Sequence, residues 1–188
     1  VENHKNLIHV SIHAGVGAGI ILDHHLYTGL AGTAGEAGHM IVQPGGRSCP
    51  CGNHGCLEQY ISEPAVLSRY RELSGRTTVS IDDLVWAYNQ KETAALAVMD
   101  EFTTYLACGI NNLWNLFSPE CIILNCQLTA YLPQLLPEIL QKLSPRFRAT
   151  CHLKLSTLQD TGVLLGAAKV CISKYLGTEK LYFSGFQP

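Results

Sequence analysis

The sequence predicts an α/β domain in which helices flank a mixed β-sheet. Residues 7–12 and 20–22 have strand composition and are separated by a glycine-rich turn, whereas most of the second half has helical patterns. The run Cys121-Ile122-Ile123-Leu124 is short and wholly apolar, as expected for a central strand that is covered on both faces. Strands followed by alternating helices and strands are typical of this fold class.

Further strands are expected where apolar residues follow turns. A turn at residues 23–25 leads to residues 26–27, and a series of glycines between 29 and 38 leads to a strand that begins at His39. In the C-terminal part, residues 151–156 also have strand composition.

Five helices are expected. Ser62 can cap a helix that begins at Glu63-Pro64, and Ser80 with Asp83 resembles a capping box for residues 81–88. A longer helix from about 92 to 117 carries apolar residues spaced by three or four and ends at Ser118-Pro119. The last two are expected near residues 132–143 and 162–175.

The 188 residues suffice for one domain, and we expect a single lobe spanning residues 1–188. The net charge of −2 provides no basic field for DNA phosphates, so we expect no direct contact with nucleic acid. No apolar run approaches the roughly 20 residues of a membrane-spanning helix, and we expect no membrane partner. The chain begins at Val1, without a methionine, and a strand is expected only a few residues later. Such a start is typical of a segment cut from a longer protein.

Eight cysteines allow a disulfide framework, but their distribution favours free and metal-bound thiols. Three lie together in a glycine-rich loop, and the chain shows no export signal at its start. We therefore expect metal-bound thiolates in a reducing cytoplasm. The other five lie singly in apolar patterns, where a buried free thiol is the commoner state: Cys108, Cys121, Cys126, Cys151 and Cys171.

The segment Cys49-Pro50-Cys51-Gly52-Asn53-His54-Gly55-Cys56 predicts a structural zinc site. Three cysteines and one histidine form a common tetrahedral ligand set. The fourth ligand is His39 or His54; His54 lies inside the tight segment, whereas His39 precedes Cys49 by ten residues, which leaves room for a returning loop. We predict Zn²⁺ at His39, Cys49, Cys51 and Cys56. The alternatives are a disulfide with a spare thiol, or free cysteines in a loop.

A glycine-rich turn allows two interpretations. Gly15, Gly17 and Gly19 could bring backbone N–H groups close to a phosphate. A phosphate loop normally opens a helix and carries Lys, Ser or Thr, whereas here a strand follows and these residues are missing from the turn. A sharp hairpin between two strands is at least as good an interpretation.

Two carboxylates flank the predicted metal site, Glu36 before His39 and Glu58 after Cys56. If a metal gathers His39 and Cys56, both carboxylates approach one edge of a pocket. Carboxylates and an imidazole nitrogen suit sugar hydroxyls, which donate and accept hydrogen bonds. From these residues alone, the alternative that both are solvated loop residues is slightly favoured.

Two stretches carry a family resemblance: Gly-Leu-Ala-Gly-Thr-Ala-Gly-Glu-Ala-Gly-His at residues 29–39 and Cys-Pro-Cys-Gly-Asn-His-Gly-Cys-Leu-Glu at residues 49–58. Together they resemble the signatures of the ROK family (repressor, ORF, kinase), and the similarity continues near residues 111–118, 122–124 and 166–168. The resemblance implies that residues 1–188 are the C-terminal lobe of an actin-like, ribonuclease H-like sugar kinase fold, with a zinc loop at 39–58.

The resemblance also implies roles for individual residues. His39, Cys49, Cys51 and Cys56 match the family zinc ligands, and Glu36, His39 and Glu58 match residues that contact the sugar. The turn from Gly15 to Gly19 matches the second phosphate motif of the kinases. The first phosphate motif and the catalytic aspartate would precede Val1, so no catalytic residue is expected in this chain, and enzymatic activity is uncertain.

Two departures favour the repressor branch of the family. Val16 stands where kinases usually carry threonine, and Asn125-Cys126 stands where they carry a Gly-Gly pair. The resemblance then implies a sugar-sensing effector domain that binds a sugar or sugar phosphate, forms dimers or tetramers, and contacts DNA only through a helix-turn-helix absent from this chain. The alternatives are an ATP-dependent hexose kinase that lacks its N-terminal lobe here, and a sugar-insensitive regulator read by a protein partner.

Overall fold

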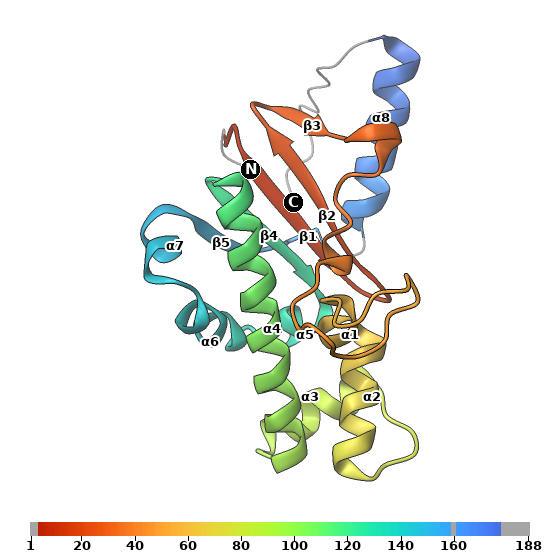
Figure 1. The fold of residues 1–188 in the computed structure, drawn as a ribbon, viewed down its shortest axis with the longest axis vertical. Helices are drawn as coiled ribbons and strands as arrows, with labels where there is room; N and C mark the ends of the chain where they lie inside the picture. Colours follow the sequence, from red (N-terminus) through yellow and green to blue (C-terminus); the bar gives the residue numbers. More distant parts are fainter. Residues whose placement is uncertain (1–3, 159–160, 178–188) are drawn as a thin grey trace. The chain divides into compact units, whose positions relative to one another are not determined.

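The computed structural model describes residues 4–158 and 161–177. They fall into two compact units, the first ending at Ser156 and the second beginning at Thr157. The first unit contains the sheet, the predicted metal loop and most of the helices (Figure 1). The second contains helix α8 (Thr161–Leu176), which corresponds to the helix expected near residues 162–175.

A five-stranded mixed sheet confirms the predicted fold class. Its strand order is β3-β2-β1-β4-β5. β1 pairs antiparallel with β2 and parallel with β4; β2 and β3 are antiparallel, and β4 and β5 are parallel. The strands are β1 (Leu7–Ile12), β2 (Val16–Leu22), β3 (His25–Tyr27), β4 (Cys121–Cys126) and β5 (His152–Leu155).

The helices of the first unit include every one that the sequence predicts there, together with three short ones. They are α1 (Glu58–Ile61), α2 (Glu63–Ser74), α3 (Ile81–Asn89), α4 (Thr93–Phe117), α5 (Gln127–Tyr131), α6 (Leu135–Lys142) and α7 (Pro145–Thr150). Two 3₁₀ turns, η1 (Leu30–Gly32) and η2 (Ala37–His39), precede them. α1, α5 and α7 were not expected, because four to six residues are too few to show a helical period.

The predicted caps are present. The Ser62 side chain accepts a hydrogen bond from the Ala65 N–H at the start of α2. Ser80 and Asp83 form a full capping box at α3, in which each residue satisfies the other's backbone N–H. α4 ends at Ser118, whose φ of 43° is left-handed. These local interactions explain why the helix boundaries follow so closely from the sequence.

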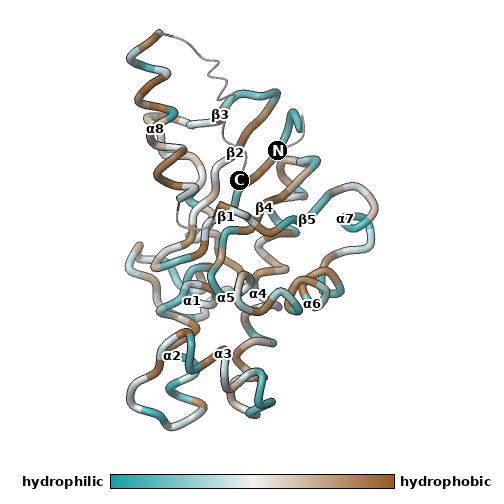
Figure 2. Tube along the Cα trace, turned by 180° about the vertical axis from the view of Figure 1, so that it is seen from behind, coloured by the Kyte–Doolittle hydropathy of each residue, from teal (hydrophilic) through white to brown (hydrophobic). Residues whose placement is uncertain are grey.

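One hydrophobic core joins the sheet to α4. Ile8 and Ile122 are partners in the parallel register of β1 and β4, so their side chains point to the same face, and both are fully buried. Phe102 and Ile110 of α4 belong to the same buried cluster. Figure 1 shows α4 crossing the sheet, and Figure 2 shows hydrophobic residues along β1 and β4.

Two predicted strand boundaries are wrong. β2 begins at Val16, so Gly17 and Gly19 lie within a strand and the turn itself occupies residues 13–15. His39 ends η2 instead of beginning a strand, and the residues after it form only an isolated bridge between Ile41 and Cys56. A strand needs a continuous partner, and here the following loop turns away after a single bridge.

The cysteines are free, including the three of the predicted metal loop. Cys121, Cys126 and Cys151 are buried as predicted, whereas Cys108 is half-buried and Cys171 is exposed. Among the helices that the structure describes, none combines the length and the apolar character needed to cross a membrane.

We predict that the loop before the metal site depends on a glycine at position 35. Gly35 has a φ of +90°, and a Cβ atom there would overlap the Ala18 carbonyl oxygen of β2. Gly35→Ala should lower the free energy of unfolding by about 2–5 kcal/mol, since a left-handed backbone costs about 1–2 kcal/mol and a steric overlap about 1–3 kcal/mol. Gly32→Ala is the control, because Gly32 has a φ of +81° but no atom near its missing Cβ. If Gly35→Ala and Gly32→Ala lower the free energy of unfolding equally in urea denaturation, the close approach of Gly35 to Ala18 has no role in stability.

Candidate metal centre and neighbouring carboxylates

Four side chains of the predicted zinc site converge on one point. The potential ligand atoms of His39, Cys49, Cys51 and Cys56 all lie within 4.8 Å of one another. His39 Nδ1 is 3.6 Å from Cys49 Sγ, and Cys51 Sγ is 3.7 Å from Cys56 Sγ. Two thiolates bound to one tetrahedral zinc are about 3.8 Å apart, given a Zn–S distance of about 2.3 Å. These two separations therefore match the ligand spacing around a tetrahedral metal ion.

Backbone hydrogen bonds fold the cysteine loop back on itself. The Cys49 N–H donates to the Asn53 carbonyl at 2.9 Å, and the Gly55 N–H donates to the Arg47 carbonyl at 2.7 Å. Gly55 has a φ of +83°, and a Cβ atom there would overlap the Gln43 carbonyl oxygen. The loop thus closes tightly only because residue 55 has no side chain.

The structure places His54 outside the cluster. His54 forms an isolated antiparallel bridge with Ser48, and its side chain is exposed. Of the two candidates for the fourth position, His39 is therefore the one that meets the thiols, brought there by η2.

The thiols of the cluster differ in their acidity. Hydrogen bonds from the Asn53 backbone and from Cys49, in that order, lower the pKa of Cys51 to about 7. Burial, together with hydrogen bonds that the Cys56 thiol donates to Cys49 and Cys51, raises the pKa of Cys56 to about 12. Without a cation, the cluster thus resists carrying three negative charges, and a divalent metal would stabilise the charged form.

The Glu36 carboxylate lies beside the ring nitrogen of His39 that faces away from the thiols. Its Oε2 is 3.9 Å from His39 Nε2, on the side of the ring away from Cys49. The Glu36 side chain is 70% exposed, so the carboxylate is also open to solvent. A carboxylate beside the second ring nitrogen orients a metal-binding histidine.

Glu58 joins the metal loop to the glycine-rich turn. Its Oε2 accepts a hydrogen bond from the Val16 N–H at 3.0 Å, and its Cβ is 3.3 Å from the position that a Cβ would occupy at Gly38. The N–H of Val16, which lies between the first two glycines of the predicted phosphate cradle, thus already has a carboxylate partner. β1 and β2 form an antiparallel hairpin, with Gly15 in its turn and Gly17 and Gly19 within β2.

A second group of polar side chains surrounds His13, which lies in this turn. His13 Nδ1 is 3.5 Å from Glu63 Oε1, and its Nε2 is 3.4 Å from Asn125 Nδ2. The Glu63 N–H, the first of α2, donates to the His13 carbonyl at 2.9 Å. Asn125 and Cys126, at the end of β4, are 3% and 4% exposed. Buried side chains therefore fill the end of β4, where Asn125-Cys126 stands in place of the Gly-Gly pair of the kinases.

Sequence reasoning missed His13, Glu63 and Gln59. Gln59 Nε2 donates to Cys49 Sγ at 3.6 Å. None of the three belongs to a recognisable motif, and His13 and Asn125 are brought together only by the parallel pairing of β1 and β4.

The ROK family matches residues 1–174 of this chain. The chain belongs to the ROK family. It is 33% identical over 184 residues to the xylose repressor of Bacillus spizizenii, covering 96% of this chain and 47% of the repressor. The chain thus spans about half the length of the curated relatives it matches.

Solved structures of ROK proteins share the fold. A ROK family transcriptional regulator described as a homologue of the Escherichia coli MLC protein superposes with a TM-score of 0.67 at 31% identity, over 80% of this chain and 41% of that one. A ROK glucokinase from Streptomyces griseus, in complex with glucose and AMPPNP, gives a TM-score of 0.76 at 23% identity, over 90% of this chain and 61% of that one. Regulators and kinases of the ROK family thus have the same fold as this chain.

We predict that the metal-free protein reacts with iodoacetamide first at Cys51. Its thiol is exposed and has a pKa of about 7, so most of it is thiolate at pH 7.5, whereas Cys56 is buried with a pKa of about 12. Because the pKa of Cys51 is lowered, its labelling rate should fall about tenfold per pH unit below 7. Mass spectrometry of labelled peptides after chelation measures this order. Labelling of Cys56 as fast as Cys51 would contradict it.

Proposed function

We propose that this chain is the sugar-sensing effector lobe of a ROK transcriptional repressor that controls carbohydrate uptake or catabolism. The observation that carries the proposal is that three groups suited to sugar hydroxyls lie in or next to the metal cluster: His39 is one of its four residues, Glu36 is 3.9 Å from the His39 ring, and Glu58 follows Cys56 by two residues. The similarity to xylose repressors supports the regulatory role. DNA contact would come from a module outside this chain, in a cytoplasmic protein that acts as a dimer or tetramer.

Zinc is the proposed metal, and its role is structural. Three thiolates and one imidazole fill all four positions of a tetrahedral zinc and leave none for water or substrate. The metal would fix His39 and the start of α1, and thereby hold the three sugar-suited groups in place. The reactivity of these thiols requires a reducing compartment, which agrees with a cytoplasmic protein.

The proposed sugar site lies between the metal loop and the β1–β2 turn. Glu36 and His39 supply an acceptor and a ring nitrogen 3.9 Å apart, and Glu58 stands on α1 beside Gly38. Such groups recognise neighbouring hydroxyls on one side of a sugar ring. A sugar that binds one arrangement of the protein more tightly than another would shift the population between them, and with it the affinity for DNA.

A hexose kinase is the second candidate, because a ROK glucokinase shares the fold. Two observations argue against a kinase. Asn125 and Cys126 place buried side chains at the end of β4, and the Val16 N–H already donates a hydrogen bond to Glu58. Because this chain spans about half the length of its relatives, the test uses the full-length protein, incubated with ATP, with D-glucose or D-xylose, and with operator DNA. Formation of a sugar phosphate would overturn the repressor proposal; sugar-dependent release of DNA without phosphorylation would support it.

We predict that Cys51→Ser removes the zinc and destabilises this lobe. Metal binding to the folded state alone contributes stability, so its loss should lower the free energy of unfolding by at least about 2 kcal/mol, or the Tm by roughly 4–8 °C. Cys171→Ser is the matched control, since Cys171 is exposed and distant in sequence from the cluster. Elemental analysis and calorimetry measure the two effects. A variant that kept both its zinc and its Tm would refute the structural role.

We predict that Glu36→Gln weakens sugar binding without loss of zinc. Removal of a charged acceptor costs about 1.5–3 kcal/mol, which corresponds to a roughly 10- to 100-fold weaker affinity for a sugar that uses it. Glu72→Gln is the control, because its side chain is 61% exposed and pairs only with Arg69 among the ion pairs described. Titration calorimetry with D-xylose and D-glucose gives the affinities. If the wild-type protein binds neither D-xylose nor D-glucose, the proposal that it senses these sugars fails.

A further inference from the structure

Gln59 contacts both segments that carry the metal-loop cysteines. Its side-chain Nε2 donates to Cys49 Sγ at 3.6 Å, and its backbone N–H donates to the Cys56 carbonyl at 3.0 Å. Its carbonyl oxygen accepts a hydrogen bond from Arg47 Nη1 at 2.8 Å. One residue of α1 thus holds the incoming and the outgoing arm of the cysteine loop.

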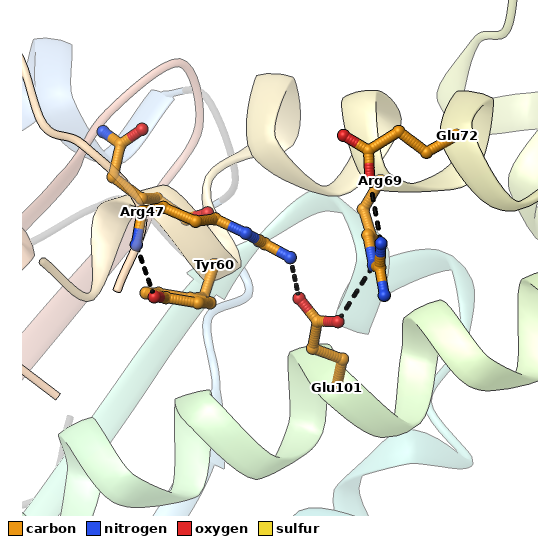
Figure 3. Close-up of polar contacts among 6 residues, drawn as sticks. Arg47, Tyr60, Arg69, Glu72 and Glu101 are labelled. Atoms are coloured by element: carbon orange, nitrogen blue, oxygen red, sulfur yellow. Dashed lines mark hydrogen bonds and ion pairs between the residues drawn. The ribbon is translucent and has the colours of Figure 1, made fainter. Parts of the chain in front are cut away.

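Arg47 is itself fixed from the helices. Its backbone N–H donates to the Tyr60 hydroxyl at 3.0 Å, and its guanidinium lies 4.5 Å from the centre of the Tyr60 ring. The guanidinium also pairs with Glu101 of α4, and Glu101 accepts from Arg69 Nε of α2 at 3.1 Å (Figure 3). The Tyr60 ring stacks on Tyr105 of α4, with ring centres 4.0 Å apart.

We propose that Gln59 is a positioning residue for the metal thiolate of Cys49, and that Glu101 holds Gln59 in place through Arg47. An amide N–H donated to a thiolate takes up part of the sulfur's negative charge and orients its lone pairs. The Arg47 contact fixes the Gln59 backbone, and so keeps the residue where its side chain can reach Cys49. The chain of contacts is α4, Glu101, Arg47, Gln59, Cys49.

This role differs from simple packing in what it requires. Packing needs only the volume of the side chain, whereas the proposed role needs the N–H itself. Gln59→Leu keeps most of the volume and removes the donor. Gln59→Glu keeps the shape and replaces the donor with a carboxylate that repels the thiolate. The inference rests on the proposed metal site, so the test begins with metal binding by the wild-type protein.

The experiment measures Zn²⁺ affinity by competition with a chromogenic chelator, together with the absorption spectrum of the Co²⁺-substituted protein. Gln59→Leu should weaken Zn²⁺ binding about 10-fold, the lower end of the effect known for residues that orient metal ligands. The thiolate-to-cobalt charge-transfer band should move to lower energy, because the sulfur donates more strongly without the hydrogen bond. Gln59→Glu should weaken binding further. Gln134→Leu, at an exposed glutamine that bonds Asn89, is the control and should change neither quantity.

A double-mutant cycle tests the link to α4. Glu101→Gln should shift the band in the same direction by a smaller amount, and should add nothing once Gln59 is leucine, because both changes act on one contact. If Gln59→Leu and Gln59→Glu leave the charge-transfer band at the wild-type position and the Zn²⁺ affinity within twofold of wild type, the proposed role of Gln59 is overturned. Additive effects of the two substitutions would overturn the link through Arg47. Absence of Zn²⁺ and Co²⁺ binding in the wild type would instead refute the metal site on which the proposed function rests.

Discussion

The arrangement depends on the convergence of three thiol sulfurs and one imidazole nitrogen within 4.8 Å. A short loop does not readily hold such a cluster ionised, because burial, and to a lesser extent the neighbouring thiols, raise the pKa of Cys56. The surrounding contacts oppose this repulsion. η2 presents His39, α1 begins directly after Cys56, and the Arg47 and Gln59 contacts tie the loop to α4. The helical layer thus supports the metal loop from one side.

The sheet is joined to the same region through one carboxylate and one backbone N–H. Glu58 bonds the Val16 N–H, and the first N–H of α2, at Glu63, bonds the His13 carbonyl. The β1–β2 turn is therefore fixed by the same helices that begin after the cysteine loop. Because β1 also pairs with β4, the position of Asn125 relative to the turn follows from the strand register. Metal loop, turn and strand ends form one connected set of contacts around the proposed sugar site.

The sequence predicts those parts of the structure that depend on local patterns. The apolar run of β4, the capping box of α3 and the choice of His39 over His54 all rest on residues close together in the chain. What the sequence does not predict depends on contacts between distant residues. Glu101 lies 54 positions from Arg47, and neither side chain indicates its partner. β2 begins among the glycines because it pairs with β1 in a hairpin, although glycine content alone disfavours a strand there.

The same contacts bear on the choice between repressor and kinase. A nucleotide phosphate at the β1–β2 turn needs free backbone N–H groups and open space at the adjoining strand ends. Here the Glu58 carboxylate accepts the N–H of Val16, the first residue after the turn, and Asn125 and Cys126 at the end of β4 are buried. A neutral sugar needs neither feature, since its hydroxyls bond to carboxylates and imidazole nitrogens. The residues around the turn thus favour recognition of a sugar over transfer of a phosphate. Since Glu58 contacts both the turn and the proposed sugar site, a bound sugar could shift the turn directly, without chemistry.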